Sequence, residues 1–455
     1  MFHRLTIYIL FLLTLVWVAP AQEQIFETEV EATKEFSSHF IRDRTLDQSY
    51  LLRVSYDQVD VFVLNDSMKV IFNKTFKIGL KQEKFYLTEL LDFTANNGVV
   101  YGFYTNYNIT IPGYLEFNMR ARNVRRGQLP FDLDKKDEYL FHFKKDGIFY
   151  MVSATRKSSL LKVYKILTPK NIKRYLYRVN EYRDLHDMFK VFSEPKDMDV
   201  GIVYDNEPCD LAITTKKIKA YVREETLDIT FESNLGTELI SLDLDSAIYT
   251  EKVIPYVKLK DKGYTNNSNS FITGDLQFVA RSSGKEVFMY VKQLDNAALL
   301  FENRFSSDMK EIPFTNELPT GETIFTSSRF YRNTPKDFLR SLGDGNVGIV
   351  ATDMGDHFLV SLGNFEELKR PLTNPYESKI SGKQAGRSSY IQTKLSKDFE
   401  WMDDAIKTLS ENSFESWFEE KDIKAKYVYA FEQSGVQYVT FLDRKAKTYN
   451  LYIFD

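Results

Sequence analysis

The stretch YLFHFKKDGIFYMVSATRKSSLLKVYKI, residues 139–166, has the pattern of three consecutive β-strands separated by tight turns. It recurs near the end of the chain as YVYAFEQSGVQYVTFLDRKAKTYNLYIF, residues 427–454. A gapless alignment gives these identities: Tyr139/Tyr427, Phe143/Phe431, Gly147/Gly435, Tyr150/Tyr438, Arg156/Arg444, Lys157/Lys445 and Tyr164/Tyr452. A chain that repeats a multi-stranded unit buries its apolar faces by stacking the copies. Most of the shared aromatic residues are therefore expected to be packing positions, with the two glycines in turns.

Similar units occur along the rest of the chain. They begin near residues 50, 86, 217, 275 and 347, and turn signals such as Asn96-Asn97-Gly98 separate their strands. Seven units of antiparallel strands resemble the β-propeller class over residues 49–455. The resemblance is architectural, because the sequence has no kelch double glycine, Trp-Asp or Asp-box signature. The alternative is two packed β-domains divided near residues 170–200.

Several segments are expected to interrupt or flank these units. Residues 22–48 are weakly patterned and suggest an N-terminal arm, so the last strand is expected to close the ring with one near Tyr50. Two helices are expected, one near 334–342 and one over 397–420. Residues 171–194 fit a helix, although YLYRV within them also permits a strand. A long excursion is expected over 364–396.

The N-terminus has the pattern of an export signal. Arg4 precedes an apolar run from about Leu5 to Val18, followed by Ala19-Pro20-Ala21, so a signal peptide over residues 1–21 is expected. The run is short for a membrane span, and no later stretch could form one. Export with a single cysteine, Cys209, and hence without an internal disulfide favours a bacterial envelope. The mature chain is expected to be periplasmic, outer-surface or secreted.

Composition excludes some partners and cofactors. The chain has 60 basic and 64 acidic residues, and a net charge of −4 argues against nucleic acid as a partner. Its five histidines show no HxH, HxxxH or HExxH spacing, so no metal site and no cofactor are expected. No GxSxG motif is present, and Cys209 is interpreted as a tolerated residue rather than a reactive thiol.

The closest approach to a catalytic constellation is Asp353, Asp356 and His357. A carboxylate beside an imidazole can move protons or hold a metal, but Asp353-Met-Gly-Asp356 also has the composition of a β-turn, which we favour. Two groups of candidate binding residues remain. Arg120, Arg122, Arg125 and Arg126 could grip phosphate, sulfate or carboxylate groups, or form a solvated loop. Trp401 and Trp417 could dock a partner or pack against the β-rich body.

These observations favour an exported, non-enzymatic propeller-like protein of the bacterial envelope that binds a protein or glycan partner. The alternative is a polysaccharide hydrolase or lyase with carboxylates in the channel, since such enzymes use two carboxyl groups. Sequence spacing cannot show which acidic residues meet. We therefore expect function to lie in segments that interrupt the repeats.

Overall fold

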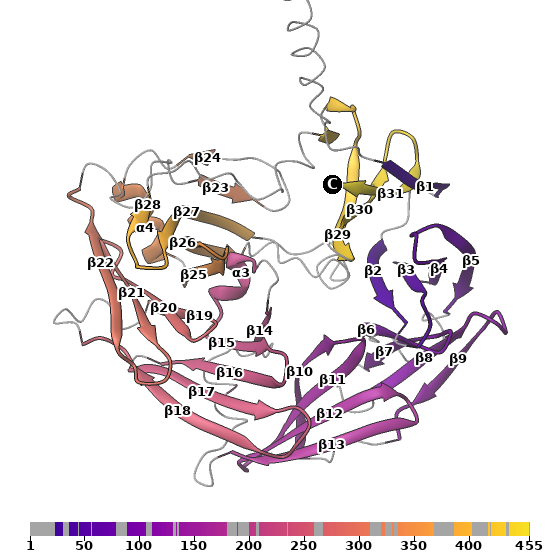
Figure 1. Ribbon diagram of the computed structural model, residues 1–455, viewed down its shortest axis with the longest axis horizontal. Helices are drawn as coiled ribbons and strands as arrows, with labels where there is room; N and C mark the ends of the chain where they lie inside the picture. Colours follow the sequence, from indigo (N-terminus) through magenta and orange to yellow (C-terminus); the bar gives the residue numbers. More distant parts are fainter. Residues whose placement is uncertain are drawn as a thin grey trace, which may run out of the picture.

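The structure is a computed structural model in which seven β-sheets are arranged around a centre (Figure 1). It describes residues 23–30, 36–78, 89–105, 112–179, 200–258, 267–309, 320–367, 386–402 and 417–454, with short gaps inside several ranges, and Phe189. Within these residues, no helix is long and apolar enough to cross a membrane. The expected signal peptide, residues 1–21, lies outside them.

The sheets are numbered as blades along the chain. Blade 1 contains β2 (Phe36–Arg42), β3 (Ser49–Ser55), β4 (Gln58–Leu64) and β5 (Val70–Lys77). Blade 2 contains β6 (Glu89–Asn96), β7 (Val99–Thr105), β8 (Pro112–Asn118) and β9 (Asn123–Gln128). Blade 3 contains β10 (Asp137–Lys145), β11 (Ile148–Thr155), β12 (Leu160–Thr168) and β13 (Asn171–Arg178). In these three blades the first strand lies nearest the centre and the fourth lies outermost (Figure 1).

Blades 4 and 5 continue the ring. Blade 4 contains β14 (Val200–Tyr204), β15 (Ile218–Val222), β16 (Thr226–Glu232), β17 (Gly236–Asp243) and β18 (Tyr249–Pro255). The short helix α3 (Leu211–Thr214) joins β14 to β15, and this connection makes β14 parallel to β15. Blade 5 contains β19 (Ser268–Thr273), β20 (Leu276–Ser282), β21 (Glu286–Gln293) and β22 (Leu299–Ser306).

Blade 6 is the least regular. Its main strands are β25 (Asn346–Asp353), β26 (His357–Glu367) and β27 (Gly386–Ser396). The outer side is built from short pieces, β23 (Thr320–Thr323), β24 (Phe330–Tyr331) and β28 (Trp401–Met402). The helix expected near 334–342 is α4 (Pro335–Asp344), whose Phe338, Leu339 and Leu342 are buried against blades 5 and 6.

Blade 7 joins the two ends of the chain. It contains β29 (Ala425–Gln433), β30 (Val436–Asp443) and β31 (Thr448–Phe454), and its outer strand is β1 (Glu23–Glu29), paired antiparallel with β31. The terminal strand thus closes its sheet with β1, not with a strand near Tyr50. The expectation of an arm over 22–48 is also wrong for the described part, since β1 and β2 lie there. The pairing of β1 follows from the need to cover the edge of β31.

The repeated stretch forms equivalent strands in blades 3 and 7. Phe143 is paired with Tyr150 across β10 and β11, and their rings stack at 4.7 Å. Phe431 and Tyr438 occupy the same places in β29 and β30, with rings stacked at 5.3 Å. Gly147 has a φ of 70° in its turn, which favours glycine. Gly435 lies outside the described residues. These four shared aromatic residues therefore form cross-strand packing pairs.

Apolar clusters fill the spaces between most neighbouring blades. One cluster joins blades 7 and 1, others join 1 to 2, 2 to 3 and 3 to 4, and a large cluster spans blades 4 to 6. At one such contact the rings of Phe103 and Phe149 stack at 4.4 Å. The alternative of two β-domains divided near residues 170–200 is wrong, because a single cluster joins blade 3 to blade 4 across that boundary.

Three local expectations are corrected. The expectation of a helix over 397–420 is wrong at its start. There the chain makes a turn and then forms β28, which pairs with the edge of β27. Trp417, Phe418 and Glu420 are helical, and residues 403–416 are not described. Residues 171–178 form β13 instead of a helix, while most of 180–199 lies outside the described residues. The ends of the excursion over 364–396 belong to the paired strands β26 and β27.

Candidate binding site at the mouth of the ring

The inner strands of blades 1, 2 and 3 end at turns that meet on one face of the ring. β2 is followed by the Asp43–Gln48 loop, β6 by the turn at Asn97-Gly98, and β10 by the turn at Asp146-Gly147. The turns of β6 and β10 place both residues at positive φ, which suits Asn, Asp and Gly. We call this region the mouth.

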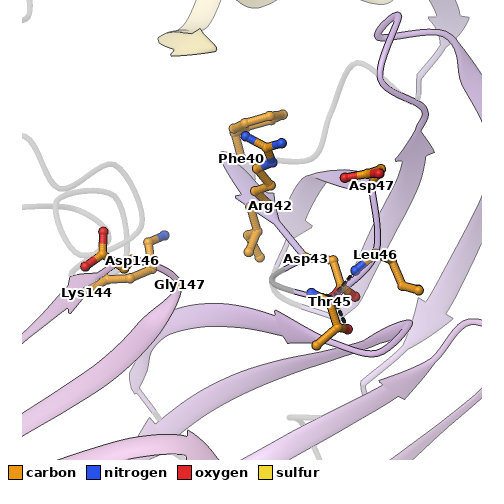
Figure 2. A pocket seen from close by; sticks show the side chains of 10 residues that line it. Phe40, Arg42, Asp43, Thr45, Leu46, Asp47, Lys144, Asp146 and Gly147 are labelled. Carbon is orange, nitrogen blue, oxygen red and sulfur yellow. Dashed lines mark hydrogen bonds between the residues drawn. The ribbon is translucent and has the colours of Figure 1, made fainter. Parts of the chain in front are cut away.

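The mouth contains a pocket of about 460 Å³. Its lining comes from β2, the loop after β2 and the end of β10, and consists of Phe40, Ile41, Arg42, Asp43, Thr45, Leu46, Asp47, Lys144, Asp146 and Gly147. Figure 2 shows Arg42 and Phe40 facing Lys144 and Asp146 across the pocket. The pocket thus lies between blades 1 and 3 and is lined by charges of both signs.

Asp43 fixes the wall of this pocket. Its buried carboxylate accepts hydrogen bonds from the backbone nitrogens of Thr45 at 2.8 Å, Asn97 at 3.1 Å and Gly98 at 2.8 Å. Burial raises the pKa of Asp43, but these hydrogen bonds to the charged form outweigh it and hold the pKa below its ordinary value. Asp43 therefore joins blade 1 to blade 2, and its carboxylate is used to accept hydrogen bonds from backbone nitrogens.

Two other charges of the lining have partners within the chain. Lys144 Nζ lies 3.3 Å from Asp92 Oδ1, and Asp146 Oδ2 lies 2.6 Å from Lys145 Nζ. Arg42 and Asp47 are exposed, and neither forms an ion pair or hydrogen bond within the part of the chain that the structure describes. The pocket therefore contains a cation, Arg42, and an anion, Asp47, that do not form an ion pair with each other.

Behind the mouth, three inner strands bring together His39, Asp92 and Lys144. Burial and the charge of Lys144 lower the pKa of His39 to about 4, although Asp92 opposes this. Burial raises the pKa of Asp92, but the charges of Lys144 and His39 bring it below its ordinary value. At neutral pH, His39 is neutral and Asp92 is ionised. Neither group is set to exchange a proton near pH 7, which general acid and base catalysis requires.

Aromatic rings connect this mouth to blade 7. Phe40 stacks on Phe431 at 4.1 Å with an interplanar angle of 13°. The backbone nitrogen of Phe40 also lies 3.4 Å from the hydroxyl oxygen of Tyr429. Because both contacts come from β29, blade 7 supports the wall that carries Arg42.

The residues suggested by the Asp353-Met-Gly-Asp356-His357 pattern lie elsewhere, at the turn between β25 and β26. Asp353 Oδ1 accepts from the backbone nitrogen of Gly355 at 2.9 Å and pairs with Lys397 Nζ at 2.5 Å. His357 Nδ1 lies 2.6 Å from Asp356 Oδ1, at an exposed position. Gly355 has a φ of 91°, so this segment is a tight turn.

The four arginines lie on blade 2. Arg120 and Arg122 are in the turn between β8 and β9, whereas Arg125 and Arg126 are in β9 itself. The interpretation of residues 120–128 as a loop is therefore wrong, because β9 completes the sheet next to β8. All four side chains are exposed.

The two tryptophans lie in separate apolar clusters. Trp401, in β28, is half-buried against Phe301 with ring centroids 5.3 Å apart. Trp417 is buried against Phe441, Tyr452 and Phe454 of blade 7. Each ring packs against the β-rich body, and the two do not share one helix face.

The structure also bears on two other kinds of chemistry, a reactive thiol at Cys209 and a metal centre. Burial and the nearby Asp210 raise the pKa of Cys209 to about 12, so its thiolate is scarce at neutral pH. Within the described ranges, no three His, Cys, Asp or Glu side chains gather in a way that could hold a metal ion.

Sequence reasoning missed the mouth residues. The Asp146-Gly147 turn was visible, but nothing in the sequence indicated that the loop after β2 faces it from two blades away. Asp43 also lay in the segment interpreted as an arm. A search for aspartates followed two residues later by Thr or Ser would have found its local backbone hydrogen bond.

No protein-family model matches this sequence, and no match is found among the curated proteins. Solved structures show distant similarity. Hsv2 of Kluyveromyces lactis has 10% identity and a TM-score of 0.31, with 93% of this chain and 98% of that chain covered. Prolyl oligopeptidase B of Galerina marginata has 9% identity and a TM-score of 0.31, with 94% and 48% covered.

An apocarotenoid oxygenase of Synechocystis has 8% identity and a TM-score of 0.30, with 60% of this chain covered. This chain spans 62% of that oxygenase. Such low similarity transfers no activity to this protein. The class of the protein rests on its own seven sheets: it is an all-β chain with the architecture of a seven-bladed β-propeller.

Proposed function

We propose that this protein is an exported, non-enzymatic β-propeller of the bacterial cell envelope that binds a protein partner at its mouth. The observation that carries the proposal is the pair Arg42 and Asp47, which line one pocket and have no partner within the described residues. A short peptide segment with both a carboxylate and a cation would neutralise both. The pocket of about 460 Å³ suits such a segment.

The rigidity of the mouth supports a binding role. Asp43 fixes the loop after β2 to blade 2, and Phe431 of blade 7 supports the same end of β2 through Phe40. Preorganised walls reduce the entropy that binding must overcome. Arg42 can hold a carboxylate with two parallel N–H groups, which gives direction as well as attraction.

The second candidate is a polysaccharide hydrolase or lyase, and one observation favours it: Asp47 and Asp146 line the same pocket. Glycoside hydrolases usually use two carboxyl groups for catalysis. Against it, His39 and Asp92 behind the pocket have pKa values displaced from the neutral range. This arrangement supports binding more than proton transfer.

A panel of short fluorescent peptides tests the binding role. Four sets are compared, carrying both charges, only a carboxylate, only a cation, or neither, and each peptide is recovered after incubation to detect cleavage. The proposal expects the set with both charges to bind most tightly and to be recovered intact. Equal binding of all four sets would contradict it. In parallel, release of reducing ends from acidic and neutral polysaccharides would favour the enzyme.

Export has its own test. Expression of the full chain in a bacterium, followed by fractionation and N-terminal sequencing, is expected to give an envelope protein that begins at Gln22. A chain in which Leu10, Leu12 and Leu13 are replaced by Asn, which breaks the apolar run, serves as the control and should stay in the cytoplasm. Equal distribution of the two chains would contradict export.

A further inference from the structure

We propose a second binding site, for an anionic polysaccharide, on the outer strands of blades 1 and 2. It consists of Lys74 on β5, Arg122 in the turn before β9, and Arg126 on β9, and we call it the cationic strip. All three side chains are exposed. It is separate from the mouth pocket, which contains none of these residues.

The alternation of side chains along β5 and β9 places these cations on the sides of the two strands that face the junction of blades 1 and 2. In β5, Phe72 and Phe76 pack into the apolar cluster between blades 1 and 2, and Lys74 lies between them on the same side of the strand. In β9, Val124 packs into that cluster, and Arg126 follows two residues later on the same side. The strip therefore runs along the junction of the two blades.

Aromatic rings hold the two arginines in place. The guanidinium of Arg122 lies over the ring of Phe72 at 5.2 Å, which is a contact between blades, and that of Arg126 lies over Tyr104 at 5.1 Å. A guanidinium stacked on a ring keeps its plane and still presents an N–H edge to an oxyanion. The fold thus supplies the aromatic support that the basic segment lacks in sequence.

The two strands that carry the strip contribute cations but no acidic side chain. On the neighbouring strand β8, Glu116 is paired with Arg125 and lies on the other face. Oxyanions such as carboxylate, sulfate or phosphate are the groups that stacked arginines bind best.

The overall charge of the chain favours a glycan chain as the source of these oxyanions. With a net charge of −4, the protein repels an extended anionic surface such as a membrane or a nucleic-acid duplex. A thin and flexible polysaccharide can follow the strip without approaching the acidic remainder. Membrane binding is then an alternative outcome for the test.

Binding of size-defined oligosaccharides measures this site. Oligogalacturonate, heparin-derived oligosaccharide and neutral maltohexaose are titrated into the full chain at low and high salt, and vesicles containing phosphatidylglycerol form a separate arm. The anionic oligosaccharides are expected to bind at low salt and weaken at high salt, while maltohexaose does not bind. The variant Lys74→Gln/Arg122→Gln/Arg126→Gln is expected to lose affinity by about tenfold or more.

The matched control removes the same charge from another outer strand. Lys173, Arg174 and Arg178 are exposed on β13, and the variant with all three replaced by Gln should bind like the original chain. Equal loss in both variants would show a general charge effect and overturn the proposal. Binding to vesicles alone would overturn it as well. So would a folded chain, with an unchanged melting temperature, that binds none of the anionic oligosaccharides.

Discussion

The carboxylate of Asp43 in blade 1 accepts a hydrogen bond of 2.8 Å from the backbone nitrogen of Gly98 in blade 2. Gly98 has a φ of 75°, so its amide is directed by a turn that few other residues would form. This contact sets the position of the loop that lines the mouth, and it links the proposed binding site to the stability of the ring.

Replacement of Asp43 by Ala should destabilise the protein by about 2–3 kcal/mol, because several backbone donors lose a charged acceptor. The measurement is the urea dependence of tryptophan fluorescence. Asp47→Ala provides the control, since Asp47 is exposed on the same loop and should change the free energy of unfolding by less than about 0.5 kcal/mol. Similar effects of both variants would show that the contact with blade 2 is unimportant.

His39 should make stability depend on pH. Its pKa in the folded chain is about 4, below the ordinary value of 6.5, so the unfolded chain binds more protons between these values. The free energy of unfolding should therefore fall as the pH drops from about 6.5 to about 4, by on the order of 2 kcal/mol. His39→Gln should flatten this dependence in thermal melts. An unchanged slope, or a histidine NMR titration near pH 6.5 for this residue, would contradict the assignment.

A buried ion pair lies within blade 4, and its lysine also forms a hydrogen bond to blade 5. Lys219 Nζ lies 3.3 Å from Glu232 Oε1 with both side chains fully buried, and Lys219 also donates to Asn269 at 2.6 Å. Lys219→Met should cost about 3–5 kcal/mol, because it leaves the Glu232 carboxylate without its countercharge. Adding Glu232→Gln should restore part of the melting temperature. A double variant that is as unstable as the sum of the single variants would argue against coupling.

Closure of the ring by β1 can be tested by truncation. A chain that begins at residue 31 lacks β1 and exposes the edge of β31, whereas a chain that begins at residue 22 keeps it. The shorter chain is expected to melt at a lower temperature and to self-associate, because an open strand edge pairs with other strands. Light scattering and thermal melts compare the two. Identical behaviour would mean that β1 contributes little to the closed sheet.

The sequence predicted the architecture because its strongest signal was periodic. Phe143 and Phe431 recur with Tyr150 and Tyr438 in one register, and a register shift would have moved these rings to the other face. The structure confirms both pairs as stacked cross-strand neighbours. The repeats therefore predicted the positions of the strands well, because local alternation and turn residues determine where a strand begins and ends.

Long-range pairing could not be predicted in the same way. β1 contains the weakly alternating EQIFETE, and only the free edge of β31 makes it a strand. Trp401 fits a helical stripe in sequence, but pairing with β27 places it in a strand. The mouth depends on Arg42 and Asp146, which come from different blades, so its composition follows from the ring and not from any local motif.

The most direct measurement of the binding role is the affinity of a mouth-binding peptide for Arg42→Gln, measured with and without the peptide's carboxylate. If Arg42 holds that carboxylate, the variant should bind the complete peptide about tenfold more weakly and the amidated peptide no differently from the original chain. Arg178→Gln on β13 is the control and should bind as the original chain does. Equal weakening for both peptides, or none for either, would contradict a ligand at the mouth held by Arg42.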